Sequence, residues 1–274
     1  MNFSPGAKFI MVPDYHIHTP LCRHAEGNPA EFKTQARRLG IPEIAFTDHV
    51  PNPDGYDPRC RMSMEEWPTY RNLILDQQTV EPPQVLFGVE ADYYEGCERF
   101  LRPSLSNQPL DLVIGSIHYL GTWGFDNPEE RQVWDTVDVT GAWQKYFELL
   151  GRFAESRLID VIGHLDLPKK FGYRPPEHAI RDMAHPALDR IAQAGLAIEI
   201  NTSGLRKPVR EIYPSAMLLA LARERDIPIC FGSDAHKPEE VGDRFEESLK
   251  LAREAGYTQA VRFSAHQKTV YPLP

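Results

Sequence analysis

The sequence predicts an α/β barrel, in which parallel strands alternate with helices. Eight short apolar, β-branched runs are separated by amphipathic segments, and this alternation is typical of α/β folds. The runs are apolar almost throughout, as expected of strands that a parallel sheet buries on both faces. Seven or eight such units indicate a barrel, and 274 residues suit one barrel domain.

The predicted strands and helices can be placed in order along the chain. The strands cover residues 10–16, 43–47, 85–90, 112–117, 160–163, 197–201, 229–233 and 260–264. Asn28 followed by Pro29 begins the first helix, and Ser63 with Glu66 forms a capping box before the next. Gly195 and Gly256 are expected to end two later helices. Three long loops, 50–62, 120–139 and 165–178, are expected to cover or build a site.

Composition limits the class of protein. There is no internal repeat or flexible linker, so residues 1–274 are predicted to form a single domain. Residues 1–13 lack the apolar run of a signal peptide, and no stretch is long enough for a transmembrane helix. Four cysteines without a CxxC pair indicate reduced thiols and a cytoplasmic protein. The net charge of −9 argues against a nucleic-acid partner but is compatible with a phosphorylated substrate at a cationic site.

Seven of the ten histidines lie at or just beyond the carboxyl ends of predicted strands, where barrel enzymes hold their active sites. With two carboxylates, the set comprises His16, His18, His24, His49, His118, His164, His236, Glu90 and Asp234. One histidine at such a place is more often a structural or surface residue. His-x-His and Asp-x-His in extended segments, however, point both side chains to one face. The sequence therefore predicts a multinuclear site for Zn, Fe or Mn.

The other histidines and the cysteines give weaker signals. His178, His185 and His266 fall in predicted loops or helix starts and are interpreted as surface residues. Cys22 lies near His24 and could approach the site, but we interpret it as a small packed thiol.

These motifs resemble the polymerase and histidinol phosphatase (PHP) superfamily, and in particular its histidinol-phosphate phosphatase branch. The matching segments begin at Asp14 (DYHIHT), Arg23 (RHAEG), Phe46 (FTDH), Gly88 (GVE), Gly115 (GSIH), Ile162 (IGH) and Phe231 (FGSDAH). They occur in family order from residue 14 to residue 236. The resemblance implies a distorted (β/α)7 barrel with the metal site at the carboxyl rim of its strands. Of the eight predicted strands, residues 260–264 are the one that this count calls into question.

The resemblance also implies three divalent transition-metal ions and their ligands. The first ion would be held by His16, His18, Glu90 and Asp234. Glu90 would bridge to a second ion, completed by His118 and His164. The third would be held by His24, His49 and His236. Every ligand position of the family is present.

Substrate contacts are implied by the segment 199–207 (EINTSGLRK). It resembles the branch segment whose arginine, here Arg206, binds phosphate. Where the family often has a further arginine, this chain has Lys169 and Lys170. A lysine supplies charge without the planar fork of an arginine. We therefore expect Arg206 and Lys169 to bind phosphate.

The expected reaction is hydrolysis of L-histidinol phosphate to L-histidinol and phosphate, a step of histidine biosynthesis. Three divalent ions with Glu90 and Asp234 give a site charge of about +4, which suits a dianionic phosphate ester. Water activated by two ions would attack phosphorus in line. Asp48, His49 or a coordinated water could protonate the leaving group, and Asp14 and Asp48 could instead orient ligating imidazoles.

Three alternatives remain open at this point. The chain could act on another small phosphate ester, such as a nucleotide or a sugar phosphate. A PHP exonuclease fits less well, because the sequence shows no basic stripe for a nucleic-acid strand. A non-catalytic, metal-stabilised barrel is the third reading.

Overall fold

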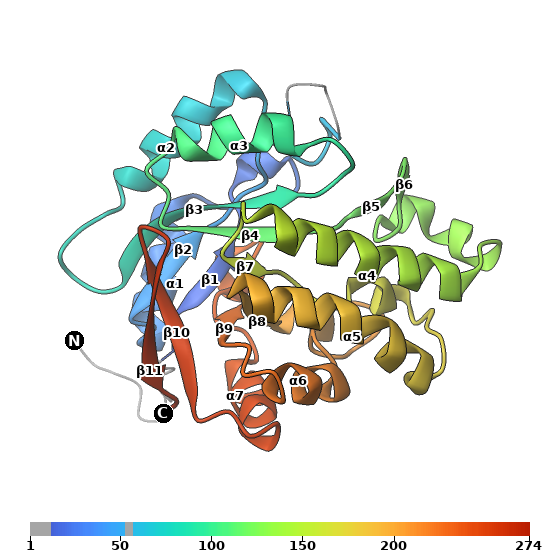
Figure 1. Ribbon diagram of the computed structural model, residues 1–274. Helices are drawn as coiled ribbons and strands as arrows, with labels where there is room; N and C mark the ends of the chain where they lie inside the picture. Colours follow the sequence, from blue (N-terminus) through green and yellow to red (C-terminus); the bar gives the residue numbers. More distant parts are fainter. Residues whose placement is uncertain (1–11, 53–56) are drawn as a thin grey trace.

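The computed structural model describes residues 12–52 and 57–274, and it shows the predicted barrel (Figure 1). A parallel sheet has the strand order β1-β2-β3-β4-β7-β8-β9. Its strands are β1 (Asp14–Ile17), β2 (Glu43–Phe46), β3 (Gln84–Asp92), β4 (Leu112–Ser116), β7 (Val161–Ile162), β8 (Ala197–Asn201) and β9 (Ile229–Gly232). A parallel bridge between Ile17 and Ala235 joins the first strand to the segment after the last. The sheet is therefore a nearly closed barrel, and the predicted (β/α)7 fold is confirmed.

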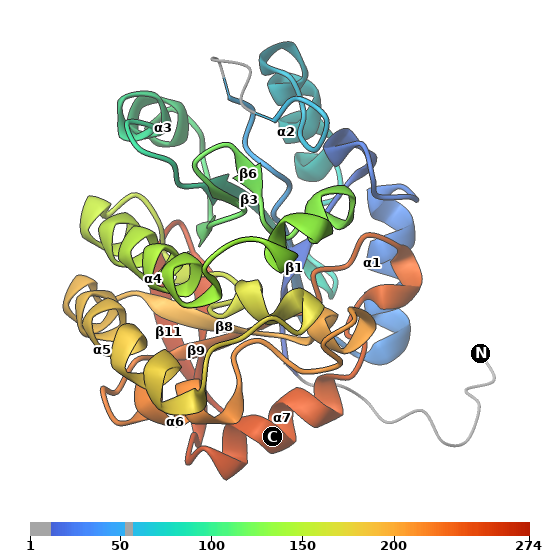
Figure 2. The same cartoon turned by 90° about the vertical axis from the view of Figure 1, so that its right-hand side faces the viewer.

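Helices surround the strands, as Figure 2 shows. They are α1 (Pro29–Leu39), α2 (Trp67–Leu75), α3 (Glu98–Ser106), α4 (Val139–Ser156), α5 (Glu177–Ala194), α6 (Ala216–Arg223) and α7 (Phe245–Glu254). The predicted cap of α1 is confirmed, because the Asn28 side chain accepts hydrogen bonds from two backbone N–H groups of the first turn. The capping box of Ser63 and Glu66 is also present. No helix was predicted for α3, where Pro103 lies inside the helix.

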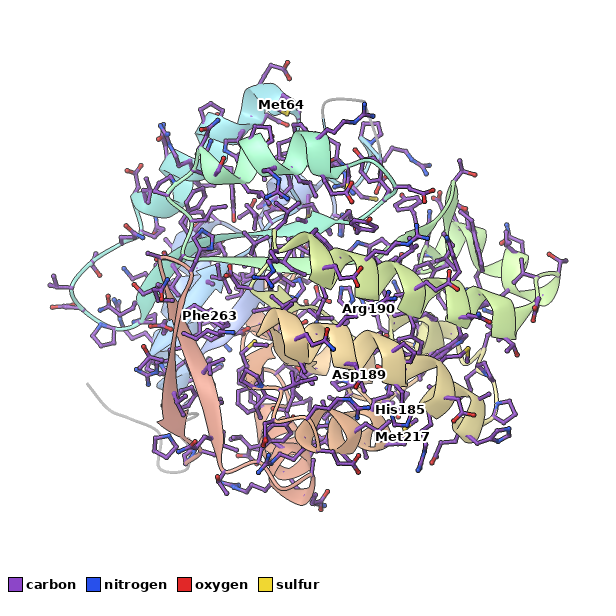
Figure 3. The ribbon with its side chains drawn as sticks, in the orientation of Figure 1. Met64, His185, Asp189, Arg190, Met217 and Phe263 are labelled. Atoms are coloured by element: carbon purple, nitrogen blue, oxygen red, sulfur yellow. The ribbon has the colours of Figure 1, made fainter. Side chains whose placement is uncertain are left out.

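The predicted strand at residues 260–264 exists but lies outside the barrel. β10 (Gln259–Ser264) pairs antiparallel with β11 (Gln267–Pro272), and Figure 1 shows this hairpin at the end of the barrel opposite to β5 and β6. Val261 and Phe263 of β10 pack into an apolar cluster with barrel residues such as Tyr15 and Cys230. The rings of Phe263 (Figure 3) and Tyr15 meet edge to face at 5.3 Å. Apolar side chains therefore fill the amino-terminal end of the barrel.

The long loops contain short elements at the carboxyl rim. Loop 120–139 includes most of a small hairpin, β5 (Tyr119–Leu120) with β6 (Trp123–Gly124), and the 3-10 helix η3 (Pro128–Asp135). Loop 165–178 contains the 3-10 helix η4 (Leu167–Phe171). Within loop 50–62, residues 53–56 lie outside the described part of the chain, as do residues 10 and 11 of the first predicted strand.

No helix in the described ranges has the length and apolar character needed to cross a membrane. One apolar cluster joins residues from Val12 to Ala260. This agrees with a single domain over residues 1–274, which stays a prediction.

Candidate metal centre

The carboxyl ends of the barrel strands bring together the histidines that the sequence singled out. Among the described residues, four groups of three have ligand atoms that all lie within 4.8 Å of one another, and two of these groups contain Glu90. The first contains His16, His18 and Glu90, and the second contains Glu90, His118 and His164. Oδ1 of Asp234 lies 3.3 Å from Nε2 of His18, so this carboxylate adjoins the first group. The first two ligand sets implied by the family resemblance are thus close in space, with Glu90 common to both.

The two carboxylate oxygens of Glu90 face different groups. Oε2 lies 3.4 Å from Nε2 of His16 and 3.6 Å from Nε2 of His18. Oε1 lies 3.1 Å from Nε2 of His164 and 3.6 Å from Nε2 of His118. Burial raises the pKa of this carboxyl, but the surrounding imidazoles, His16 foremost, hold it well below its usual range. A carboxylate with one oxygen toward each set has the geometry of a bridging ligand.

His16 shows why these residues fit metal ions. Its Nδ1 lies 2.7 Å from Oε1 of Glu199. A carboxylate accepts only, so this nitrogen carries the hydrogen and Nε2 of a neutral ring carries the lone pair. Nε2 is buried, has no hydrogen-bond partner and faces Oε2 of Glu90. Two electron pairs that face each other require a positive species between them. Burial lowers the pKa of His16, yet Glu199 and Glu90 raise it well above its usual range, so a proton or a metal ion is strongly bound there.

His118 is held in a similar way on the other side. Its Nδ1 contacts Oδ1 of Asp92, while Nη2 of Arg61 donates to Oδ2 of Asp92 at 2.5 Å. Burial lowers the pKa of His118, but Asp92 and Glu90 together raise it to about 10. Asp92 therefore fixes the ring so that Nε2 faces Glu90, as carboxylates do behind metal-bound histidines.

The third implied set is only partly assembled. Nε2 of His24 and Nε2 of His236 lie 2.9 Å apart, as two ligands of one ion would. His49 points elsewhere: its Nδ1 lies 3.1 Å from Oε2 of Glu90, and its ring centroid is 5.9 Å from that of His24. Cys22 is buried, and its sulfur lies within 4.8 Å of ligand atoms of His18 and His236.

The two aspartates that the sequence offered for orientation or catalysis are both buried and saturated by protein groups. Oδ2 of Asp48 accepts from the backbone and hydroxyl of Thr19, and Oδ1 accepts from the backbone of His49 at 2.8 Å. Oδ1 of Asp48 also lies 3.6 Å from Nδ1 of His18. Asp14 accepts from the backbone and hydroxyl of Ser233, the first residue after β9. These contacts orient the ligand-bearing segments.

The predicted phosphate contacts also have protein partners. Lys169 is buried, and its ammonium contacts Asp166 at 2.9 Å, Glu211 at 3.3 Å and the carbonyl of Ile212 at 2.7 Å. Three acceptors match the three donors of an ammonium. A phosphate contact at Lys169 would require one of them to leave.

Arg206 follows the same pattern. Its Nη2 donates to the carbonyls of Ser233 at 2.7 Å and Asp234 at 3.2 Å. Its Nη1 donates to Asp243 at 3.3 Å, and Nε lies 3.5 Å from Glu240. Arg206 therefore holds the turn that presents Asp234, and these contacts leave one N–H group of the guanidinium for a ligand.

Two functional candidates were not identified from the sequence. Glu199 is a charged residue in the middle of the buried strand β8, and Asp92 ends β3 two residues after Glu90. The signal was present in both: an acidic side chain in a buried apolar run needs a partner, and residues two apart on a strand share a face. Glu199 also explains why residue 232 is a glycine, because a Cβ at that position would lie 1.8 Å from Oε1 of Glu199.

We expect Glu199→Gln to weaken metal binding and activity by about 10–100-fold, the usual cost of losing a carboxylate behind a metal-bound histidine. Oε1 of Glu199 faces His16, while Oε2 accepts from the backbone of His164 at 3.1 Å and from Asn201 at 3.0 Å. Either orientation of the new amide places an NH2 group against a donor. Chelator competition measures the affinity, with the exposed Glu247→Gln as control. Unchanged affinity would show that His16 does not depend on Glu199.

Comparisons with known proteins agree with this arrangement. The model of the PHP domain matches residues 14–203, and a model described as PHP-associated matches residues 217–244. A protein of Deinococcus radiodurans described as a probable histidinol-phosphatase is 46% identical over 245 residues, which cover 89% of this chain and 93% of that protein. The histidinol-phosphatase of Bacillus subtilis is 29% identical over 263 residues, covering 86% of this chain and 98% of that protein.

A solved structure supports the fold. The histidinol phosphate phosphatase of Lactococcus lactis, crystallised with zinc, L-histidinol and phosphate, superposes with a TM-score of 0.78 at 20% identity. The superposition covers 94% of this chain and 98% of that one.

Proposed function

Since this chain belongs to the PHP domain family, we propose that it is a metal-dependent phosphomonoesterase that hydrolyses L-histidinol phosphate to L-histidinol and phosphate. The observation that carries the proposal is Glu90, whose two oxygens face two sets of imidazoles at the carboxyl rim. The names of the relatives over nearly the full chain specify the substrate. The proposal includes a cytoplasmic location and a role in histidine biosynthesis.

The electrostatics of the site fit a phosphate dianion. Three divalent ions with Glu90 and Asp234 carry a charge of about +4, and the buried Glu199, Asp92, Asp48 and Arg61 lower this to about +2. Those three carboxylates face imidazole nitrogens rather than the rim. A site that keeps a positive charge favours a dianionic ester over a neutral amide or sugar.

Three divalent transition-metal ions form the proposed cofactor. When bound, they would activate a water molecule and neutralise the developing negative charge on phosphate. His16, His18, Glu90 and Asp234 would hold the first, and Glu90 with His118 and His164 the second. His24 and His236 would hold the third, with His49 turning from Glu90 to join them. The Lactococcus lactis relative binds zinc; zinc, iron and manganese all suit imidazole and carboxylate ligands.

The protein's own polar groups position the reactants. Glu199 accepts from Nδ1 of His16 at 2.7 Å and keeps that ring in a fixed orientation, while Oδ1 of Asp48 lies 3.6 Å from Nδ1 of His18. In this proposal Asp48 positions His18. To donate a proton to the leaving group, Asp48 would have to give up one of the hydrogen bonds that it accepts from Thr19 and His49. Arg206 would use its remaining N–H to bind a non-bridging phosphate oxygen. Because Arg206 also bonds to the Asp234 carbonyl, this oxygen would lie near the turn that presents Asp234. Lys169 stays a predicted contact whose ammonium is engaged in the protein.

Metal content tests the cofactor. We expect elemental analysis of protein purified without chelators to approach three transition-metal equivalents per chain. The predicted ligands offer sets of four, three and three donors, and the open positions are left for water or phosphate, as catalysis requires. Saturation near one equivalent would contradict the three-ion centre.

The reaction is tested by phosphate release from a panel of monoesters after metal is returned to stripped protein. The expected result is that histidinol phosphate has the highest kcat/KM, above nucleoside and sugar phosphates. Preference for a nucleotide or a sugar phosphate would move the chain to another phosphoesterase. Absence of turnover on every ester, with full metal content, would indicate the non-catalytic barrel.

A further inference from the structure

Two loops at the carboxyl rim each carry a pair of adjacent basic residues near the candidate metal centre. Lys169 and Lys170 lie in η4 after β7, and Arg206 and Lys207 lie at the end of η5 (Thr202–Arg206) after β8. A backbone hydrogen bond from Val209 to the carbonyl of Lys170, 3.0 Å long, ties the two loops together. These four side chains are positive charges that the loops following β7 and β8 carry near the rim.

Their partners distinguish the four. Lys169 and Arg206 are held by the contacts described above. Nζ of Lys170 lies 3.0 Å from Oδ2 of Asp126. For Lys207, the described ranges 12–52 and 57–274 provide no carboxylate within ion-pair distance and no side-chain hydrogen bond. An ammonium without a protein partner is available to a bound anion.

Lys207 is also part-buried rather than solvated on the surface. Burial lowers the pKa of its ammonium, and the charges of Lys170 and Arg206 lower it further, while Asp234 and Asp126 raise it. Asp126 in turn interacts electrostatically with His118 and His164. Arg206, the neighbour of Lys207 in the chain, contacts the Asp234 carbonyl at 3.2 Å, so this loop places Lys207 beside the turn that presents Asp234. Keeping an unpaired cation there is unfavourable unless an anion accompanies it.

We propose that Lys207 binds the phosphate group at the metal centre and supplies the second cationic contact, which the sequence led us to expect at Lys169. The inference rests on the proposed function in that the anion is taken to be phosphate. Arg206 and Lys207 are adjacent in the chain, so the same loop that fixes the Asp234 turn brings the free ammonium to the ligand.

The test uses metal-loaded protein and inorganic phosphate, so that it does not depend on which ester is hydrolysed. Lys207→Met should weaken phosphate binding, measured by calorimetry, by about ten- to hundredfold, the strength of a hydrogen bond between charged groups. Lys207→Arg should retain most of the affinity because the charge remains. Metal content should stay at the wild-type value. With a hydrolysed ester, KM should rise more than kcat falls.

The matched control is Lys250→Met on α7, whose side chain is 75% exposed and lies 3.7 Å from Glu254; it should bind phosphate like the wild type. Phosphate affinity of Lys207→Met within twofold of wild type, at equal metal content, overturns the inference. The same loss in both methionine variants would also overturn it, because net charge alone would explain the effect. If histidinol phosphate is not hydrolysed but Lys207→Met still loses phosphate, the proposed substrate fails and the Lys207 contact stands.

Discussion

Glu90→Gln should remove two metal ions together and lower kcat by on the order of a thousandfold or more. Each oxygen of Glu90 faces a different set of imidazoles, so one substitution affects both groups. An amide presents one weakly ligating oxygen and one NH2 group, which cannot bridge two cations. Loss of a single electrostatic donor typically costs about 10²–10³ in kcat, and here two charged ions are involved.

The control for this substitution separates bridging from ordinary ligation. His49→Ala should mainly reduce occupancy of the third ion, because the proposal assigns His49 to that ion, with His24 and His236, once its ring turns away from Glu90. Elemental analysis and kcat are measured for both variants under the same metal concentration. Full metal content with near-normal kcat in Glu90→Gln would show that Glu90 does not bridge.

Most of the fold was predictable because buried parallel strands leave a clear pattern. The prediction for β8, residues 197–201, coincides with the strand, and β2, β4 and β9 differ by a residue at one end. The pattern at residues 260–264 correctly indicated a strand. The pattern could not show that this strand pairs with β11 instead of a barrel strand, because Val261 and Phe263 are as buried at the end of the barrel as residues of the sheet are.

The site was predictable where residues act by type, and less so where they act by contact. Histidines at strand ends indicate a candidate metal centre from the sequence alone. Glu199 and Asp92 gave a weaker sequence signal, because their roles depend on the rings that they contact, His16 and His118. Likewise, the sequence alone does not distinguish the roles of Lys169 and Lys207. The structure separates them, because Asp166 and Glu211 approach Lys169 and no described carboxylate forms an ion pair with Lys207.

Substitution of Arg206 is expected to lower kcat/KM strongly, and the structure supplies two reasons for this. Its guanidinium would contact phosphate through the remaining N–H, and it holds the carbonyls of Ser233 and Asp234. Asp234 has a positive φ of 52°, a backbone conformation that is uncommon for non-glycine residues, and Arg206 bonds to the carbonyls on either side of this turn. Removing Arg206 therefore affects both the substrate and the presentation of a ligand.

We expect Arg206→Ala to lower kcat/KM for histidinol phosphate by about a hundredfold or more, since a clamp on a transferring phosphoryl group is typically worth about 2.7–4 kcal/mol. Assays at saturating metal keep Asp234 liganded and isolate the substrate contact, and metal content should then equal that of the wild type. Arg206→Lys should recover only part of the loss, because a lysine cannot serve two carbonyls, two carboxylates and a phosphate at once. Steady-state kinetics with parallel metal analysis decide the matter. A kcat/KM within about threefold of wild type, well under 1.4 kcal/mol, would remove Arg206 from phosphate binding and leave it only as the anchor of the Asp234 turn.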